Sequence, residues 1–150
     1  MTQKSFIKIL EEKGYSYKTE GDKIVVTHRG RVYLRSLTSL PPGVEFKNGG
    51  NVDLSSLTSL PPGVQFENGW NVYLNSLETL PPGVEFKNNG DVDLSSLKTL
   101  PPGVEFKNGR DVFLPSLIGG RFGEWYGNIK GIDGNRLLNK MIELGLFDRI

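Results

Sequence analysis

The sequence predicts a mainly β protein with a single domain, built as a parallel β-solenoid of about five coils of 20 residues. The first observation is the run Leu-Pro-Pro-Gly-Val, which recurs without insertions and starts at Leu40, Leu60, Leu80 and Leu100. The second is that apolar and polar residues alternate within each repeat. The third is that helical periodicity marks the two ends of the chain. One such repeat cannot bury its apolar face alone, so stacked coils must bury it together.

Each repeat predicts two short strands. Val44 and Phe46 alternate with charged neighbours, and Val52 and Leu54 flank Asp53. This period of two turns one side of each strand toward a core and the other outward. A degenerate first coil over residues 21–40 has apolar residues at the equivalent positions: Ile24, Val26, Val32 and Leu34. Stacking equivalent strands ~4.8 Å apart predicts two parallel sheets and a rod about 24 Å long.

Turns and polar columns are predicted at the corners of the coils. Gly43 completes a Pro-Pro-Gly turn, and the Asn48-Gly49 pair favours the left-handed conformations of a second turn. Repetition predicts an asparagine column (Asn48, Asn68, Asn88 and Asn108) and a serine column (Ser36, Ser56, Ser76, Ser96 and Ser116). We expect each side chain to bond its neighbour in the column and the buried corner backbone, which is a structural role. His28, the only histidine, is expected to end the asparagine column.

An N-terminal cap is predicted over residues 1–20, because open coils would expose apolar surface and unpaired strand edges. Within residues 3–13, four residues recur at helical spacing: Phe6, Ile9, Leu10 and Lys13. Gly14 is the expected end of this helix, and a hairpin through Gly21 and Asp22 leads into the repeats, residues 21–120.

A C-terminal cap is predicted over residues 121–150, so that residues 1–150 form one repeat domain. This segment contains the pattern of an amphipathic helix that ends at Gly145. Its apolar residues are expected to point toward the last coil: Leu137, Leu138, Met141, Ile142 and Leu144.

Composition restricts the classes of partner. The net charge is +1, and residues 41–120 carry only 5 basic against 9 acidic side chains, so nucleic acid and anionic lipid are not expected partners. No apolar run approaches the ~20 residues of a membrane span, and the N-terminus lacks the pattern of a secretory signal. The absence of cysteine fits the cytosol. We therefore expect a cytoplasmic protein that does not enter membranes.

Motifs of catalysis and metal binding are nearly absent. The chain has no cysteine, one histidine, and none of the metallohydrolase, nucleophile-elbow, P-loop or dinucleotide fingerprints. Three carboxylates are candidate calcium ligands: Asp53, Asp91 and Asp93. Calcium-binding coils of the Gly-Asp type repeat at about nine residues, however, whereas these repeat at 20. We expect no enzymatic activity, no metal and no cofactor.

The candidate binding surface is an outward column in which aromatic and acidic residues alternate. This aromatic–acidic column lies between the buried Val and Leu of the second strand in successive coils: Tyr33, Asp53, Tyr73, Asp93 and Phe113. Trp70 and Arg110 replace glycines at nearby corners, and Trp125 and Tyr126 lie toward the C-terminal cap. Exposed Tyr, Trp and Arg dominate protein interfaces. The column predicts that another protein is the partner.

The same pattern leaves other hypotheses open. Aromatic residues also stabilise sheets by packing across strands, and interposed Asp discourages aggregation of a flat face. End-to-end assembly of coils is a second alternative, if the caps fail to cover the strand edges. Nucleic-acid binding is a third, although Asp53 and Asp93 would repel phosphates beside the rings. The outward columns that contain Glu45 and Lys47 predict only a solvated face of mixed charge.

The run VDLSSLTSLPPGVQF at residues 52–66 resembles the short leucine-rich repeats of bacterial and bacteriophage proteins, and this likeness extends over residues 21–120. The helical N-terminal lead and the C-terminal segment are also similar to the ends of phage-encoded members. The resemblance implies a recognition scaffold, made by a phage in its bacterial host, that inhibits a host or defence complex.

This chain departs from the leucine-rich pattern, because V-x-L-x-S-L-x-x-L replaces L-x-L-x-x-N-x-L and the asparagine moves to the F-x-N-G corner. A curved horseshoe and a straighter two-sheet solenoid are therefore both open. The family places its contacts at variable outward positions, so no family site residue can be carried over.

Overall fold

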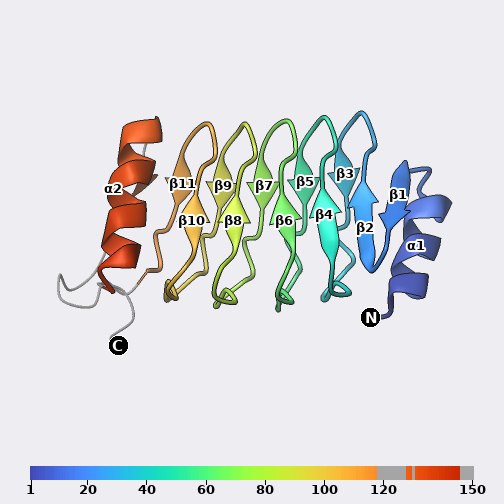
Figure 1. Cartoon of the computed structure of the whole chain (residues 1–150), viewed down its shortest axis with the longest axis horizontal. Helices are drawn as coiled ribbons and strands as arrows, with labels where there is room; N and C mark the ends of the chain where they lie inside the picture. The colour runs from blue at the N-terminus through green and yellow to red at the C-terminus, as the bar shows by residue number, and fades with distance from the viewer. Residues whose placement is uncertain (118–127, 130, 146–150) are drawn as a thin grey trace.

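The computed structural model describes residues 1–117, 128–129 and 131–145, and it confirms the predicted parallel β-solenoid. Two six-stranded sheets form its walls, and each has five parallel strands from successive coils and one antiparallel strand at an end. The coils follow one another in a nearly straight row between helix α1 with strand β1 at one end and helix α2 at the other (Figure 1). This shape is the straighter two-sheet solenoid and not a horseshoe.

The strands are very short, and their register repeats from coil to coil. Sheet A contains, in spatial order, β1 (Tyr17–Glu20), β2 (Lys23–Val26), β4 (Val44–Phe46), β6 (Gln65–Phe66), β8 (Glu85–Phe86) and β10 (Glu105–Phe106). Sheet B contains β12 (Asn128–Ile129), β11 (Val112–Phe113), β9 (Val92–Asp93), β7 (Val72–Tyr73), β5 (Val52–Asp53) and β3 (Val32–Tyr33). Phe66 pairs with Phe86, and Val52 pairs with Val72. Each residue in the parallel strands therefore lies beside its own equivalent in the next coil.

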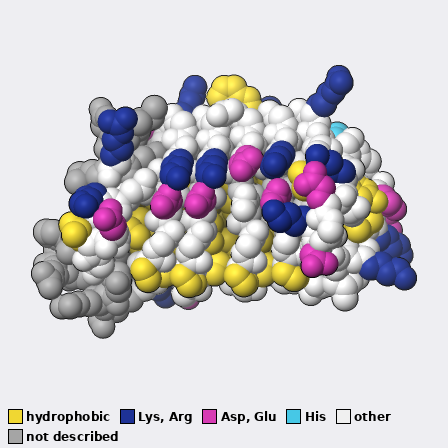
Figure 2. Space-filling model, in the orientation of Figure 1, with side chains coloured by type: hydrophobic (Ala, Val, Ile, Leu, Met, Phe, Trp, Pro, Cys, Tyr) yellow, Lys and Arg dark blue, Asp and Glu magenta, His cyan; other side chains and the backbone are white. Residues whose placement is uncertain are grey.

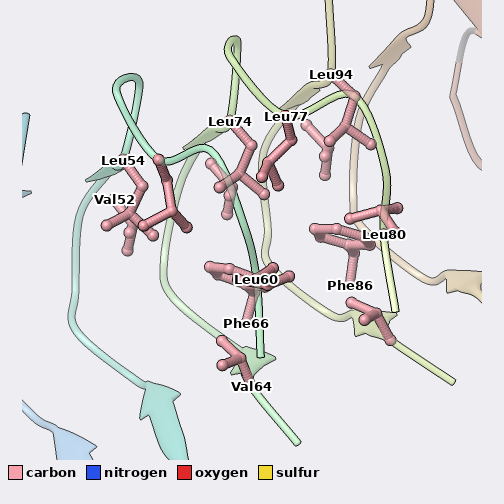
Figure 3. Packing of buried hydrophobic residues seen from close by; sticks show 14 of the residues in the cluster. Val52, Leu54, Leu60, Val64, Phe66, Leu74, Leu77, Leu80, Phe86 and Leu94 are labelled. Carbon is pink, nitrogen blue, oxygen red and sulfur yellow. The ribbon is translucent and has the colours of Figure 1, made fainter. Parts of the chain in front are cut away.

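The core is a set of apolar columns between the two sheets. Four phenylalanines stack face to face along the axis, with successive ring centres 5.4, 5.3 and 5.1 Å apart: Phe46, Phe66, Phe86 and Phe106. Leu54, Leu74 and Leu94 are fully buried above these rings (Figure 3). Because every coil contributes the same side chains at the same height, Phe66 and Phe86 each pack between two like rings, and no coil has a complete core of its own.

The asparagine column is buried and hydrogen-bonds the corner backbone. Asn68 Nδ2 lies 3.1, 3.3 and 3.1 Å from the carbonyl oxygens of Gly50, Trp70 and Asn71. Asn48 repeats this pattern with one carbonyl of the preceding coil and two of its own corner. Among the described residues no hydrogen bond joins two asparagines of the column, so that part of the prediction is wrong. The amide instead donates to corner carbonyls and so links successive coils, since the Gly50 carbonyl accepts from both Asn48 and Asn68.

Among the described residues no hydrogen bond joins two serines of the serine column, so that part of the prediction is wrong, and most of these side chains lie at the surface. Ser56 is exposed and falls in the turn after the second strand, where its side chain points to solvent. The hydroxyls of Ser76 and Ser116 donate to the carbonyls of Ser55 and Ser95 at 2.5 and 2.6 Å. These are bonds between coils, but they are made outside the core.

His28 ends the asparagine column, as predicted. Its carbonyl accepts the N–H of Gly49 at 2.9 Å, just as the carbonyl of Asn48 accepts the N–H of Gly69. Its ring lies 5.0 Å from the ring of Tyr15, and its Nδ1 accepts the N–H of Ser16 at 3.4 Å. The histidine thereby joins the first coil to the N-terminal hairpin.

The two corners use glycine for different reasons. Gly43 has φ +79°, which fits the predicted Pro-Pro-Gly turn. No left-handed conformation occurs at Asn48 or Gly49, so that prediction is wrong. Gly49 is needed for close approach instead, since a Cβ there would lie 2.2 Å from the carbonyl oxygen of Arg29. Asn89 takes this position in the fourth coil. Its N–H donates to the carbonyl of Asn68 at 3.1 Å, whereas the N–H of Gly49 donates to the carbonyl of His28 at 2.9 Å.

The four edges of the parallel array meet four different caps. Antiparallel β1 pairs with β2, and antiparallel β12, which the sequence pattern did not predict, pairs with β11. At the free edge of β3, the hydroxyl of Tyr15 accepts the N–H of Tyr33 at 3.0 Å. At the edge of β10, Asn139 Oδ1 accepts the N–H of Phe106 at 2.7 Å, and Asn139 Nδ2 donates to the Phe106 carbonyl at 2.9 Å. One amide side chain thus replaces a neighbouring strand.

The N-terminal helix confirms its prediction. Helix α1 (Gln3–Glu12) begins after Thr2, whose hydroxyl accepts the N–H of Ser5 at 3.1 Å. Phe6 and Leu10 are fully buried against the first coil. The helix is followed by Gly14 at φ +71°.

The C-terminal helix α2 (Gly131–Glu143) covers the last coil with Leu138 and Ile142, and Gly145 follows it at φ +70°. Leu144 is 61% exposed, so its predicted inward position is wrong; it lies just beyond the last helical turn. The side chain of Leu137, together with Trp125 and Tyr126, falls outside the described residues. Neither helix in the described part of the chain is long and apolar enough to cross a bilayer.

Replacing Asn68 by Ala should lower the free energy of unfolding by about 3 kcal/mol, because three hydrogen bonds to corner carbonyls are lost. Chemical denaturation of the purified variant measures this loss. Ser56→Ala, at the exposed position of the preceding corner, is the control and should change stability by less than about 0.5 kcal/mol. Equal losses in the two variants would contradict the structural role of the buried amide.

Replacing Asn139 by Ala should expose the edge of β10. Amide hydrogen exchange at Phe106 should accelerate at least about tenfold, since its N–H loses its acceptor. The N–H of Glu105, which donates to the Val84 carbonyl at 2.9 Å, should keep its protection. Lys140→Ala, at an exposed position of the same helix, should alter neither amide. Unchanged exchange at Phe106 would show that the helix itself, and not this amide, closes the edge.

Candidate binding surface

Strand register brings the aromatic–acidic column together on the outer face of sheet B. Tyr33 pairs with Asp53, Asp53 with Tyr73, Tyr73 with Asp93, and Asp93 with Phe113. The predicted alignment is therefore confirmed. The side chains shield one another: Tyr33 is 38% exposed, Asp53 only 4%, and the other three are half-buried. The column is less exposed than its outward position alone implied.

A depression of about 440 Å³ opens between Tyr33 and Tyr73, with Asp53 among its lining residues. The rest of its lining is polar: Arg35, Asn51, Ser55 and Asn75. These four residues are not among the site residues predicted from the sequence. The signal that could have found Arg35, Ser55 and Asn75 is the strand period of two, which places them on the same face as the column member two residues earlier.

The buried carboxylate of Asp53 is held on both oxygens. Asp53 Oδ2 accepts Arg35 Nε at 2.5 Å, and Oδ1 accepts the N–H and the hydroxyl of Ser55 at 3.1 and 2.6 Å. Burial raises the pKa of Asp53, but the hydrogen bonds from Ser55 and Arg35 together lower it more, so the pKa lies below its usual value. The guanidinium carbon of Arg35 also lies 5.6 Å from the ring centre of Tyr33.

A second polar column flanks the aromatic–acidic column and positions its tyrosines. Asn51 Oδ1 accepts the N–H of Asn71 at 3.0 Å, and Asn71 Oδ1 accepts the N–H of Asp91 at 2.8 Å. Asn71 Nδ2 lies 3.0 Å from the hydroxyl of Tyr73. Asn51 and Asn71 thus use their side-chain oxygens, which are potential calcium ligands, to accept backbone N–H groups. Within the described ranges, no three His, Asp or Glu side chains converge to hold a metal ion.

Trp70 and Arg110 meet at the corner that leads into sheet B. The guanidinium carbon of Arg110 lies 5.3 Å from the ring centre of Trp70, and Trp70 is 51% exposed. Gly90 occupies the corner between them, and a Cβ there would lie 2.3 Å from Asn71 Oδ1. Because Asn71 also contacts Tyr73, the Trp70–Arg110 pair adjoins the aromatic–acidic column. All seven candidate residues therefore lie along one side of the solenoid.

The outer face of sheet A has a different character. Basic and acidic side chains form neighbouring rows over it (Figure 2). Lys87 lies 2.9 Å from Glu85, and Lys107 lies 2.8 Å from Glu105. This confirms the predicted face of mixed charge, but Glu45 is buried and not solvated, with its carboxylate 2.9 Å from Lys23 Nζ. Exposed pairs of this kind contribute little to stability and leave no concentrated charge for a partner.

Comparison of the chain with protein-family models, with curated proteins and with solved structures finds no match. The contacts on sheet B therefore carry the functional argument.

The lowered pKa of Asp53 predicts a pH dependence of stability. The folded protein binds the proton of the Asp53 carboxyl group less tightly than the unfolded chain does. The stabilisation that ionised Asp53 contributes is therefore complete above the unfolded pKa of about 4, and it is lost as the pH falls through the folded pKa. Asp53→Asn should cost roughly 2 kcal/mol at pH 7, because charge-assisted hydrogen bonds are lost. Denaturation of both proteins from pH 7 to 2 should show this difference shrinking in acid; a constant difference would contradict the assignment.

Proposed function

We propose that this chain is a non-enzymatic binding protein whose sheet B presents the aromatic–acidic column to another protein. The observation that carries the proposal is the depression between Tyr33 and Tyr73, which adjoins the exposed Trp70–Arg110 pair. Tyr, Trp and Arg supply much of the binding energy at protein interfaces. A packed solenoid also holds them in place before binding, which reduces the entropy lost on association.

Sheet packing alone explains this column less well. Aromatic side chains stabilise a sheet most when they lie directly opposite other aromatic or β-branched residues. Here each aromatic residue is paired with a carboxylate, as Tyr73 is with Asp53 and Asp93. The aromatic rings of the column therefore do not stack on one another as the phenylalanines of the core do, and they are separated by space.

The resemblance to short leucine-rich repeats of bacteriophage proteins supports a narrower form of the proposal. On that basis the protein acts in the cytoplasm of a bacterial host and inhibits a host or defence complex. The four capped edges favour such a role over end-to-end assembly, because an incoming coil would have to displace a cap.

Affinity capture from a bacterial lysate, including cells that express defence complexes, tests the proposal. The native chain should retain a partner that the triple variant Tyr33→Ala, Tyr73→Ala, Phe113→Ala loses by more than about tenfold, as expected when interface anchors are removed. A matched triple variant on sheet A should still retain it: Glu85→Ala, Lys87→Ala and Glu105→Ala.

Circular dichroism and thermal unfolding must first show that both triple variants are folded. Equal capture by all three proteins, or by none of them, would assign the aromatic–acidic column to sheet packing and overturn the proposed binding face.

A further inference from the structure

The aromatic–acidic column contains the same arrangement twice. In the first slot Asp53 lies between Tyr33 and Tyr73, and in the second slot Asp93 lies between Tyr73 and Phe113. Both carboxylates are held in the same way. Ser95 donates its N–H to Asp93 Oδ1 at 3.0 Å and its hydroxyl to the same oxygen, as Ser55 does for Asp53.

The two slots differ at several positions, including Phe113 in place of Tyr73 and Asp91 in place of Asn51, and one of the differences removes the cation that pairs with the carboxylate. Arg35, from the first coil, pairs with Asp53 and lies against the Tyr33 ring in the first slot. The equivalent residue two coils later is Asn75. No described cation pairs with Asp93, whose Oδ2 receives no hydrogen bond from any described residue. The second slot therefore repeats the arrangement of two aromatic residues around a carboxylate, without the guanidinium of the first slot.

The core shows what fits between side chains two coils apart. Phe66 lies between Phe46 and Phe86, with its ring centre 5.4 Å from one and 5.3 Å from the other. The same repeat separates Tyr73 from Phe113, and the side chain between them is Asp93, which is smaller than a phenylalanine. A guanidinium is planar, stacks on aromatic rings and donates several N–H groups to a carboxylate, whereas an ammonium is a compact point charge.

We infer that the second slot binds an arginine side chain of the partner protein. Its guanidinium occupies the space between Tyr73 and Phe113 and donates to Asp93 Oδ2, as Arg35 does within the first slot. Asp91, in the flanking polar column, accepts the N–H of Asp111 at 3.0 Å and adds negative charge beside this slot. The inference rests on the proposed function, because the partner has to supply the arginine.

NMR titration of the isotopically labelled full chain with N-acetyl-arginine methylamide tests the slot without any partner. Saturable shifts should appear at Tyr73, Asp93 and Phe113, with a dissociation constant in the millimolar range expected for one side chain. The lysine and citrulline analogues separate charge from planarity, and each should bind at least about fivefold more weakly. Equal binding of all three probes, or shifts elsewhere on the chain, would overturn the inference.

Two variants alter the position that holds Arg35 in the first slot and Asn75 in the second. Asn75→Arg introduces a guanidinium beside Asp93 and should abolish probe binding by filling the slot from within. Arg35→Gln vacates the first slot and should add a second set of shifts at Tyr33 and Asp53. Asp93→Asn keeps the shape of the second slot, removes its charge and should lose the probe. Undiminished binding to folded Asn75→Arg would show that the probe binds elsewhere.

The outcomes separate this inference from the proposed function. A partner that needs the aromatic residues but binds Asp93→Asn unchanged would leave the binding face intact and overturn the arginine slot. Probe binding at Asp93 without any captured partner would support the slot and contradict the broader function.

Discussion

The structure depends on one constraint, which is that every coil takes 20 residues to return to the same place. Strands of two or three residues have few hydrogen bonds of their own and are held by neighbours in strict register. The buried asparagines depend on the same constraint, since Asn68 must reach a carbonyl of the preceding coil and two of its own corner. An insertion within one coil would displace every column at once, from the phenylalanines to the corner amides.

The same register builds the outer surface. Equivalent positions face the same way in each coil, so substitutions there alter the surface without disturbing the core. The alternation of Tyr33, Asp53 and Tyr73 spaces aromatic rings two coils apart and places a carboxylate between them. The strand period thus converts a pattern of single residues into two related slots. The first slot contains the Arg35 guanidinium, whereas the equivalent residue two coils later is Asn75.

Much of the fold could be predicted from the sequence, because its signals repeat. The coil period, the two strands per coil, the inward phenylalanines and the helix stops at Gly14 and Gly145 all follow from local rules. Contacts that depend on side-chain reach could not be predicted in this way. The use of Asn139 as a substitute strand at Phe106, and of Tyr15 at Tyr33, requires knowing where the caps lie against the array.

For the candidate site, the sequence by itself determined which residues share the outer face of sheet B, because the period of two and the repeat of 20 place Tyr33, Tyr73 and Phe113 in one column. Only the tertiary structure decided which side chains on this face are buried. Asp53 is buried between Tyr33 and Tyr73 and paired with Arg35 of the preceding coil, and Trp70 contacts Arg110 across Gly90, which has no side chain. Backbone periodicity is local and readable, whereas the rotamer of a long side chain is chosen by neighbours 18 to 40 residues away.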